Sequence, residues 1–238
     1  MIIDKNFFDH THSFFKDVSK EYLLPNLGNL ETHQISEKPD NSLVTKFDLI
    51  IENELIRYFK EKGFKNIISE ENNSNLLNYS QYLTIDPIDG TRNFINGINK
   101  VVIMVSCINE NKSIFSIIYD PVLDNFYYSF DNKIFKNHSL IIPKKCYHHI
   151  GFLSSHAKVF FKNEISEYTE KVRSRSIGYD VIEILEGDRT FMTLYGSKIW
   201  DLFPAMSFMS NLDFNTNLER FEFNFNILNK KIIFYAKI

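Results

Sequence analysis

Apolar residues in the first 63 positions recur at helical spacing in two segments. Between residues 3 and 22 they predict an amphipathic helix that ends before Pro25. A second helix is predicted from Leu43 to the Lys62-Gly63 pair, where glycine suits a helix end. Its apolar stripe consists of Phe47, Ile50, Ile51, Leu55 and Phe59. Residues 29–42, which are mostly polar, predict a loop or at most a short edge hairpin.

Short apolar runs separated by turn residues predict a series of strands between the second helix and residue 142. The runs cover residues 66–68, 82–86, 101–108, 113–119 and 126–130. Because these strands follow one another closely, we expect antiparallel pairing within a layered α+β sandwich.

Beyond Ile142 the pattern is weaker and mixes strands with helices. It predicts strands at 149–155, 191–195 and 232–236, and helices at 160–173, from Arg175 to Gly187 and from Trp200 onward. Two sheets in succession suggest two subdomains. We expect an N-terminal α+β subdomain at residues 1–145 and a C-terminal α/β subdomain at residues 146–238.

Composition narrows the class of protein. The 238 residues are 44% hydrophobic and 24% charged, which is typical of a globular chain with a substantial core. A net charge of −3 gives no field that would attract polyanions, so we expect no nucleic acid as the main partner. The two cysteines suggest a reducing compartment. Polar residues interrupt the apolar positions of the first segment, which is unlike a signal peptide, and the apolar runs are too short to span a membrane. We therefore expect a cytoplasmic protein that does not enter the membrane.

Two carboxylates directly follow a predicted strand in the stretch LTIDPIDGTRNF, residues 83–94. Pro87 and the Asp89-Gly90 pair predict a sharp turn, and Thr91 suits the N-cap of a short helix. Carboxylate and carbonyl oxygens suit Mg²⁺, and amides at a helix start bind phosphate. The stretch can therefore supply both halves of a metal-dependent phosphate site. The alternative is an ordinary strand-to-turn sequence that binds nothing.

Further acids stand at element boundaries elsewhere in the chain. Asp48 follows Thr45 by three residues at a helix start, and sequence alone favours a capping box there. The Glu70-Glu71 pair follows a short strand, where a solvated loop is the alternative. Asp201 lies at the start of another predicted helix.

With these acidic positions in this order, the sequence resembles the inositol monophosphatase family of lithium-sensitive, magnesium-dependent phosphatases. The matching segments are Val44–Asp48 (VTKFD), Ser69–Glu71 (SEE), Asp86–Phe94 (DPIDGTRNF) and Trp200-Asp201. Supporting matches are Tyr119–Val122 (YDPV) and Arg175–Gly178 (RSIG). The resemblance covers residues 10–201 well and the remainder loosely.

The resemblance implies an αβαβα layered sandwich, often assembled as a homodimer, that binds two or three Mg²⁺ ions. It implies a first ion held by Glu70, Asp86 and the Ile88 carbonyl, a second between Asp86, Asp89 and Asp201, and a weaker third on Glu70 and waters. Glu71 is outside the ligand set. Asp201 is expected to reach the other acids only in the folded protein.

The same resemblance implies that Thr91 and Asp48 polarise the attacking water, while the amides of Gly90 and Thr91 bind phosphate oxygens. This arrangement suits the hydrolysis of a phosphate ester, because two Mg²⁺ ions about 3.5–4 Å apart can clamp the attacking and leaving oxygens. The ligand set contains no histidine or thiolate, which argues against zinc. Cys146, His148 and His149 form the other ligand-like cluster, which lacks further partners and is expected to be ordinary surface.

The substrate side of the sequence departs from the family pattern. The family has an acid that contacts substrate hydroxyls shortly before Trp-Asp, and none occurs between Arg189 and Trp200. Met209–Leu212 replaces an expected Ala-Gly-Gly turn. Arg92 is either a substrate contact or a surface charge. We therefore expect a phosphate monoester that is not specifically an inositol phosphate.

Several alternatives remain open on sequence grounds. Histidinol phosphate, or a nucleotide or sugar bisphosphate, is an alternative substrate within the same superfamily. A regulatory or binding protein with weak catalysis is an alternative of another class. A haloacid dehalogenase-like phosphatase is set aside, because Pro87 stands where its nucleophilic aspartate belongs.

Overall fold

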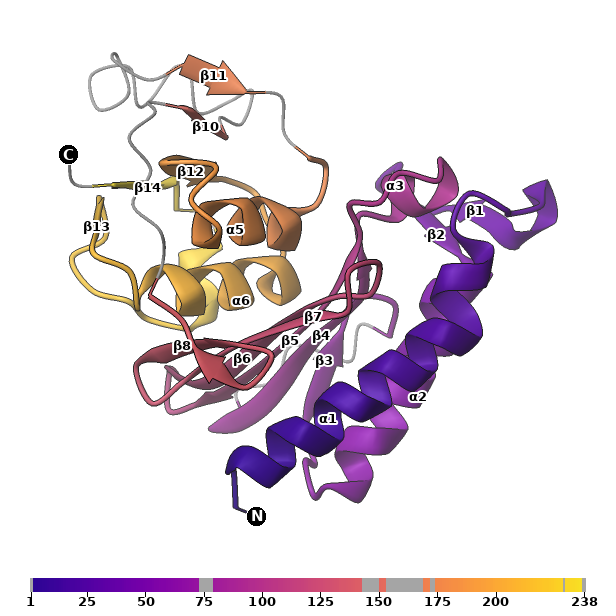
Figure 1. The fold of residues 1–238 in the computed structure, drawn as a ribbon, viewed down its shortest axis with the longest axis horizontal. Helices are drawn as coiled ribbons and strands as arrows, with labels where there is room; N and C mark the ends of the chain where they lie inside the picture. Colours follow the sequence, from indigo (N-terminus) through magenta and orange to yellow (C-terminus); the bar gives the residue numbers. More distant parts are fainter. Residues whose placement is uncertain are drawn as a thin grey trace.

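The computed structural model describes residues 2–72, 79–142, 150–152, 169–171, 174–228 and 230–236. Its central element is a seven-stranded sheet with helices on both faces (Figure 1). Helices α1 and α2 cover one face, and α5 and α6 cover the other. No helix in these ranges has the length and apolar character that a membrane span requires.

The large sheet has the strand order β3-β4-β5-β6-β7-β8-β9. Its strands are Ile67–Ser69, Gln81–Asp89, Val102–Asn109, Lys112–Asp120, Asn125–Phe130, Lys133–Lys136 and Ser139–Leu140. Every neighbouring pair is antiparallel except β3 and β4, which are parallel. The predicted antiparallel pairing is thus confirmed for β4 to β7. Strands β8 and β9 were not predicted, because they are too short to show a period.

The α1 face of the sheet contains the aromatic part of the core. Helix α1 (Lys5–Val18) continues through a π-turn at Ser19–Leu23 and a 3₁₀ turn at Leu24–Asn26. Together with α2 (Lys46–Glu61), it buries phenylalanines such as Phe15 and Phe59 against the sheet.

The start of α2 differs from the sequence prediction. Leu43–Thr45 forms strand β2, which pairs with β1 (Ile35–Glu37), so the helix begins at Lys46. Of this hairpin, β1 lies within the range predicted as a loop or at most a short edge hairpin, whereas β2 lies where the helix was predicted; a 3₁₀ turn at Thr32–Gln34 precedes β1. Helix α3, Thr91–Ile95, follows the end of β4.

Helices α5 (Ile177–Leu185) and α6 (Ile199–Met209) separate the large sheet from a second sheet. The second sheet has the order β11-β10-β12-β14-β13. Its strands are β10 Ile150–Phe152, β11 Thr169–Lys171, β12 Phe191–Leu194, β13 Phe214–Thr216 and β14 Ile232–Ala236. Parallel pairs join β11 to β10 and β10 to β12, and antiparallel pairs join β12 to β14 and β14 to β13. A 3₁₀ turn at Phe225–Ile227 precedes β14.

The secondary structure predicted from the sequence is partly wrong in this region. The predicted helix at 160–173 is wrong at 169–171, which form strand β11, and its other positions lie outside the described residues. The predicted strand at 149–155 is observed at Ile150–Phe152 as β10, and its other positions lie outside the described residues; β13 was not predicted. Helices and mixed sheets in successive layers confirm the α+β layered fold. The subdomain boundary at 145/146 lies within residues that are not described, and it stays a prediction.

Candidate metal and phosphate site

Strand β4 contains an irregularity at Pro87 that decides where its carboxylates lie. Asp86 is paired with Met104 and Asp89 with Val102, so the register shifts between the two aspartates. Proline lacks the N–H that a ladder needs, and bulges accept such residues. In a regular strand, residues three apart point to opposite faces. The irregularity lets Asp86 and Asp89 point into one cluster, and it extends the strand beyond the predicted end at residue 86.

Three carboxylates meet at this end of the sheet. Ligand oxygens of Asp86, Asp89 and Asp201 all lie within 4.8 Å of one another. Asp201 comes from the first turn of α6, more than a hundred positions along the chain. The expectation that Asp201 reaches the pair in the folded protein is confirmed. We call these three residues the acid cluster.

The acid cluster is electrostatically unfavourable on its own. Burial, followed by the charge of Glu70, raises the pKa of Asp86 well above its ordinary value and that of Asp201 to about 7. Burial and then Asp201 raise the pKa of Asp89 in the same direction. Buried like charges at this spacing favour proton uptake or a bound cation.

Neutral donors orient two of these carboxylates. Asp89 Oδ2 accepts hydrogen bonds from the Ser176 hydroxyl at 2.8 Å and from the Gly178 amide at 2.6 Å. Asp86 Oδ1 accepts one from the Ile88 amide at 3.0 Å. Such donors fix the directions of the carboxylates without neutralising their charge, so the cluster keeps the charge and the oxygens that could hold a cation.

The donor set fits Mg²⁺. It consists of carboxylate oxygens only, from the three residues of the acid cluster, and hard divalent cations prefer such ligands. Among the described residues, this is the group of three acids, histidines or cysteines that is close enough to hold one ion.

Asp48 has two structural roles rather than one. Its Oδ2 accepts the Thr45 amide at 2.8 Å, while the Thr45 hydroxyl accepts the Asp48 amide at 3.4 Å, which completes a capping box. Its Oδ1 accepts a hydrogen bond from the Thr91 hydroxyl at 3.2 Å. Burial raises the pKa of the Asp48 carboxyl to about 6. The cap is therefore observed, and it leaves the second oxygen for Thr91.

The turn after β4 differs in one detail from the prediction. Gly90, not Thr91, is the N-cap of α3, with a φ of 101°. A Cβ on Gly90 would lie 2.8 Å from the Lys100 carbonyl oxygen, so both backbone angle and space require glycine. Thr91 is the first helical residue, and its hydroxyl lies 3.2 Å from the Ile88 carbonyl as well as from Asp48.

The sequence model of the inositol monophosphatase family matches residues 14–206. The chain belongs to the inositol monophosphatase family. A 3'(2'),5'-bisphosphate nucleotidase CysQ from Haemophilus influenzae is 34% identical over 101 residues, which are 39% of this chain and 36% of that protein. A fructose-1,6-bisphosphatase/inositol-1-monophosphatase from Methanocaldococcus jannaschii is 31% identical over 120 residues, 50% of this chain and 46% of the relative. The matched segment thus spans less than half of either relative.

Solved structures of similar fold cover nearly the whole chain. An IMPase from Thermotoga maritima superposes with a TM-score of 0.77 at 17% identity, over 97% of this chain and 92% of its own. An IMPase/NADP phosphatase complexed with Mg²⁺ and phosphate gives a TM-score of 0.78 at 17% identity, over 98% and 91%. At this identity the likeness establishes the fold.

Glu70, expected as a ligand in this family, lies beside the acid cluster rather than in the group of three. Its charge raises the pKa values of Asp86 and Asp201, but its Oε1 is paired with Lys38 at 2.9 Å. Lys38 also contacts Glu71 at 2.7 Å. Burial opposes the charge on Lys38, yet the two glutamates raise its pKa overall. The same lysine thus neutralises part of the charge beside the cluster.

Glu71 is held by contacts with Glu52 and Lys38. Its amide donates to Glu52 Oε2 at 2.8 Å, and burial raises the pKa of its carboxyl to about 7. The Glu70-Glu71 pair is therefore anchored to α2 and to Lys38. It is not a solvated loop.

Sequence reasoning missed several residues that support the site in this family member. Lys38 stands in a polar loop, where no pattern distinguishes it. Ser176 and Gly178 lie within a matched motif, but nothing in the sequence connects them to Asp89. Asn93 donates to the Lys100 and Ser174 carbonyls, both at 2.7 Å, and so ties α3 to the segment before α5. Arg92 is exposed beside Thr91, which leaves both of its predicted roles open.

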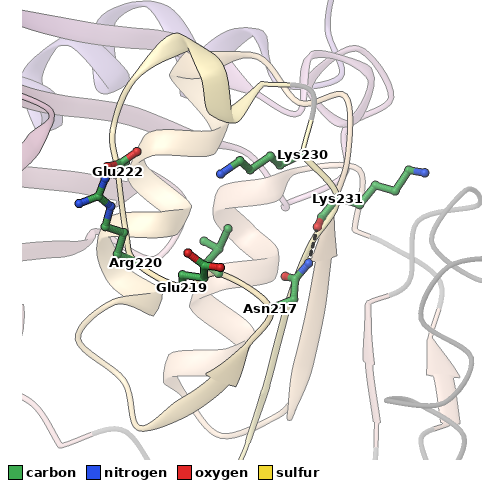
Figure 2. A pocket seen from close by; sticks show the side chains of 7 residues that line it. Asn217, Glu219, Arg220, Glu222, Lys230 and Lys231 are labelled. Carbon is green, nitrogen blue, oxygen red and sulfur yellow. Dashed lines mark hydrogen bonds and ion pairs between the residues drawn. The ribbon is translucent and has the colours of Figure 1, made fainter.

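A separate cavity of about 460 Å³ lies near the C-terminal strands (Figure 2). Charged residues of both signs line it, and Asn217 closes one side by donating to the Lys231 carbonyl at 2.7 Å. The lining residues are Asn217, Leu218, Glu219, Arg220, Glu222, Lys230 and Lys231. None of them is a predicted site residue, so this cavity is not part of the acid cluster.

Proposed function

We propose that the protein hydrolyses a small-molecule phosphate monoester in an Mg²⁺-dependent reaction. The observation that supports this most directly is the convergence of Asp86, Asp89 and Asp201 oxygens within 4.8 Å, with neutral donors orienting the two buried residues Asp86 and Asp89. Family membership supports the same reaction class.

The proposed Mg²⁺ ligands are Glu70, Asp86, the Ile88 carbonyl, Asp89 and Asp201, for two or three ions. Bound Mg²⁺ neutralises phosphate charge and lowers the pKa of water. Glu70 can join the set once Lys38 yields its Oε1, because the two cations compete for one carboxylate.

Asp48 and Thr91 are proposed to handle the proton of the attacking water. Because the Thr91 hydroxyl donates to Asp48, its oxygen can accept a hydrogen bond from water, and a proton taken from that water passes through the hydroxyl to the Asp48 carboxylate. An ionised Asp48 holds the hydroxyl in that direction, and a pKa of about 6 keeps it ionised at neutral pH. The Gly90 and Thr91 amides are proposed to bind phosphate oxygens at the start of α3.

The proposed substrate is a phosphate monoester other than a specifically recognised inositol phosphate. Strand β12 and the residues up to Trp200 contain no acid to accept hydrogen bonds from a polyol. A site without that acceptor discriminates poorly among polyols. Bisphosphorylated nucleotides are the second candidate, because CysQ nucleotidases are among the similar proteins. A homodimeric assembly and a cytoplasmic location are part of this proposal.

The experiment is a substrate panel with saturating Mg²⁺. It compares inositol 1-phosphate, histidinol phosphate, fructose 1,6-bisphosphate and 3'-phosphoadenosine 5'-phosphate, for wild type and Asp89→Asn. We expect turnover of at least one substrate other than inositol 1-phosphate, and a loss of orders of magnitude in the variant. Absence of turnover across the panel favours the regulatory alternative. A strong preference for inositol 1-phosphate contradicts the substrate proposal alone.

A further inference from the structure

A buried aspartate lies next to the acid cluster without belonging to it. Asp180, in the first turn of α5, is 1% exposed. After burial and the charge of Asp201, the charge of Asp180 also raises the pKa of Asp89. Burial of one more carboxylate so near the cluster costs free energy, because like charges repel and water is excluded. The proposed reaction gives Asp180 no role, so the contacts of its carboxylate have to explain its presence.

The Asp180 carboxylate holds Ser174, which lies before the helix. Its Oδ1 accepts hydrogen bonds from the Ser174 amide at 3.1 Å and from the Ser174 hydroxyl. The oxygen of that hydroxyl accepts the Ser176 amide at 3.1 Å and lies 2.7 Å from the Ser176 carbonyl. Ser174 is therefore bonded to the helix on one side and to the backbone of Ser176 on the other.

The turn that Asp180 holds has a backbone conformation that needs support. Arg175, between the two serines, has a φ of 67°. A residue other than glycine rarely adopts such an angle, and the angle persists where neighbouring contacts fix it. The bonds from Ser174 to Asp180 and from the Ser176 amide to Ser174 fix the residues on both sides of Arg175. We therefore expect this turn to relax when Asp180 is removed.

The same turn supplies a donor that orients Asp89. The Ser176 hydroxyl oxygen accepts the Tyr179 amide at 3.1 Å, and its proton is donated to Asp89 Oδ2 at 2.8 Å. From the other side, Asn93 of α3 donates to the Ser174 carbonyl at 2.7 Å. The turn thus connects α5 both to Asp89 and to α3, whose first residue is proposed to bind phosphate.

We infer that Asp180 is a positioning residue for the proposed Mg²⁺ site, and the inference rests on that proposed function. By holding Ser174, Asp180 keeps the Ser176 hydroxyl in the place from which it orients Asp89. Groups behind a metal ligand fix its direction and contribute to metal affinity in this way. Without Asp180, the Asp89 carboxylate can adopt other rotamers, and a bound ion has to select one of them with a loss of affinity.

Asp120 provides a matched comparison. It is also 1% exposed, and its Oδ1 accepts the amides of Val122 at 2.9 Å and Leu123 at 3.1 Å, in its own turn after β6. Asp120→Ala and Asp180→Ala each remove a buried carboxylate and two local hydrogen bonds, so their effects on stability should be similar. Asp180 differs in being linked to Asp89 through the two serines.

The experiment measures Mg²⁺ affinity by titration calorimetry of the full chain at pH 8, with thermal melting to check folding. Asp89→Asn first identifies the equivalent of Mg²⁺ that depends on Asp89. We expect Asp180→Ala to weaken that equivalent by about 10–100-fold, the range found for residues behind metal ligands. Asp120→Ala should melt at a similarly lowered temperature and bind Mg²⁺ as wild type does.

Ser174→Ala separates positioning from charge, because it keeps the Asp180 carboxylate and removes the hydroxyl link to Ser176. We expect it to weaken the same equivalent of Mg²⁺. The double variant should be no weaker than Asp180→Ala, because the two residues act in one chain of contacts. If Ser174→Ala binds Mg²⁺ as wild type does, the inference is wrong. Ser174→Ala gives the same decision if Asp180→Ala does not fold.

Two outcomes distinguish this inference from the proposed function. Wild-type Mg²⁺ affinity in Asp180→Ala overturns the positioning role and leaves the proposed function intact. Absence of Mg²⁺ binding in the wild-type protein contradicts the proposed function, and the positioning role with it.

Discussion

The hydroxyl of Thr91 lies 3.2 Å from Oδ1 of Asp48, across 43 positions of sequence. This contact joins the first turn of α2 to the first residue of α3, beside the acid cluster. It also uses the carboxylate oxygen that the capping box leaves over, so one aspartate serves both a helix start and the candidate site.

Substitution of Asp48 by asparagine separates these two roles. We expect turnover to fall by roughly 10²–10⁴-fold, the usual contribution of a positioned proton acceptor. The free energy of unfolding should change by about 1 kcal/mol or less, because asparagine also caps helices. Asp4→Ala, which removes the α1 cap on Phe7, is the matched control and should lower stability by about 1 kcal/mol with turnover unchanged. Equal turnover in Asp48→Asn and wild type assigns Asp48 to capping alone.

Because the pKa values of the carboxyl groups at the site are raised, the stability of the protein should depend on pH in opposite ways with and without bound metal. Folded-state pKa values of about 6 for Asp48 and about 7 for Asp201 lie above the ordinary value of 3.8. The folded chain thus binds more protons than the unfolded chain between about pH 4 and 7, and the stability of the metal-free protein falls as pH rises through that window. Mg²⁺ should bind the ionised form and reverse the loss. Thermal melting at pH 5 and pH 8, in chelator and in Mg²⁺, should show the larger Mg²⁺ stabilisation at pH 8. An equal effect at both values contradicts the prediction.

Gly178 is a position where space, rather than backbone angle, excludes a side chain. A Cβ there would lie 2.5 Å from Met104 Sδ and 2.6 Å from Val102 Cγ2. We expect Gly178→Ala to cost about 1–3 kcal/mol of stability and to weaken Mg²⁺ binding, since the Gly178 amide holds Asp89. Ser176→Ala removes the other donor to Asp89 without overpacking and gives the comparison. Wild-type Mg²⁺ affinity in Gly178→Ala would show that α5 does not position Asp89.

Lys38 partly occupies the position that a cation beside Glu70 would take. In Lys38→Met, the two glutamates lose their ammonium partner, and the metal-free protein should melt at a lower temperature. Mg²⁺ should restore more stability to this variant than to wild type, because no lysine competes for Glu70. Lys133→Met, at an exposed lysine 4.0 Å from Asp131, is the surface control. The idea fails if both variants respond to Mg²⁺ as wild type does.

The stretch at residues 83–94 allowed the site to be predicted, because its residue types have local consequences. Carboxylates after a strand, a glycine turn and a following helix are all consequences of nearby sequence. The bulge at Pro87 was not predicted, since a run of β-formers before a proline gives no measure of how far the strand continues. Asp201 was placed by family resemblance alone, because its approach to Asp86 depends on tertiary packing.

Contacts between distant segments account for most of what the sequence did not reveal. Lys38 lies in a polar loop, and only the fold brings it to Glu70. His12 is one of several polar residues on an amphipathic helix, and its hydrogen bond with His138 depends on the unpredicted strands β8 and β9. The helix predicted at 160–173 shows the converse, since pairing with β10 overrides local preference at 169–171.

The acid cluster combines Asp86 and Asp89, at the C-terminal end of the inner strand β4, with Asp201 of α6, in the helix layer that packs on the large sheet. A bound ion would therefore act as a crosslink between two layers. Any partial opening that lifts α6 from the sheet removes one ligand, so the residence time of the ion and the frequency of that opening are coupled quantities. Hydrogen exchange of the α6 amides, measured against metal concentration, reads out that coupling without any substrate.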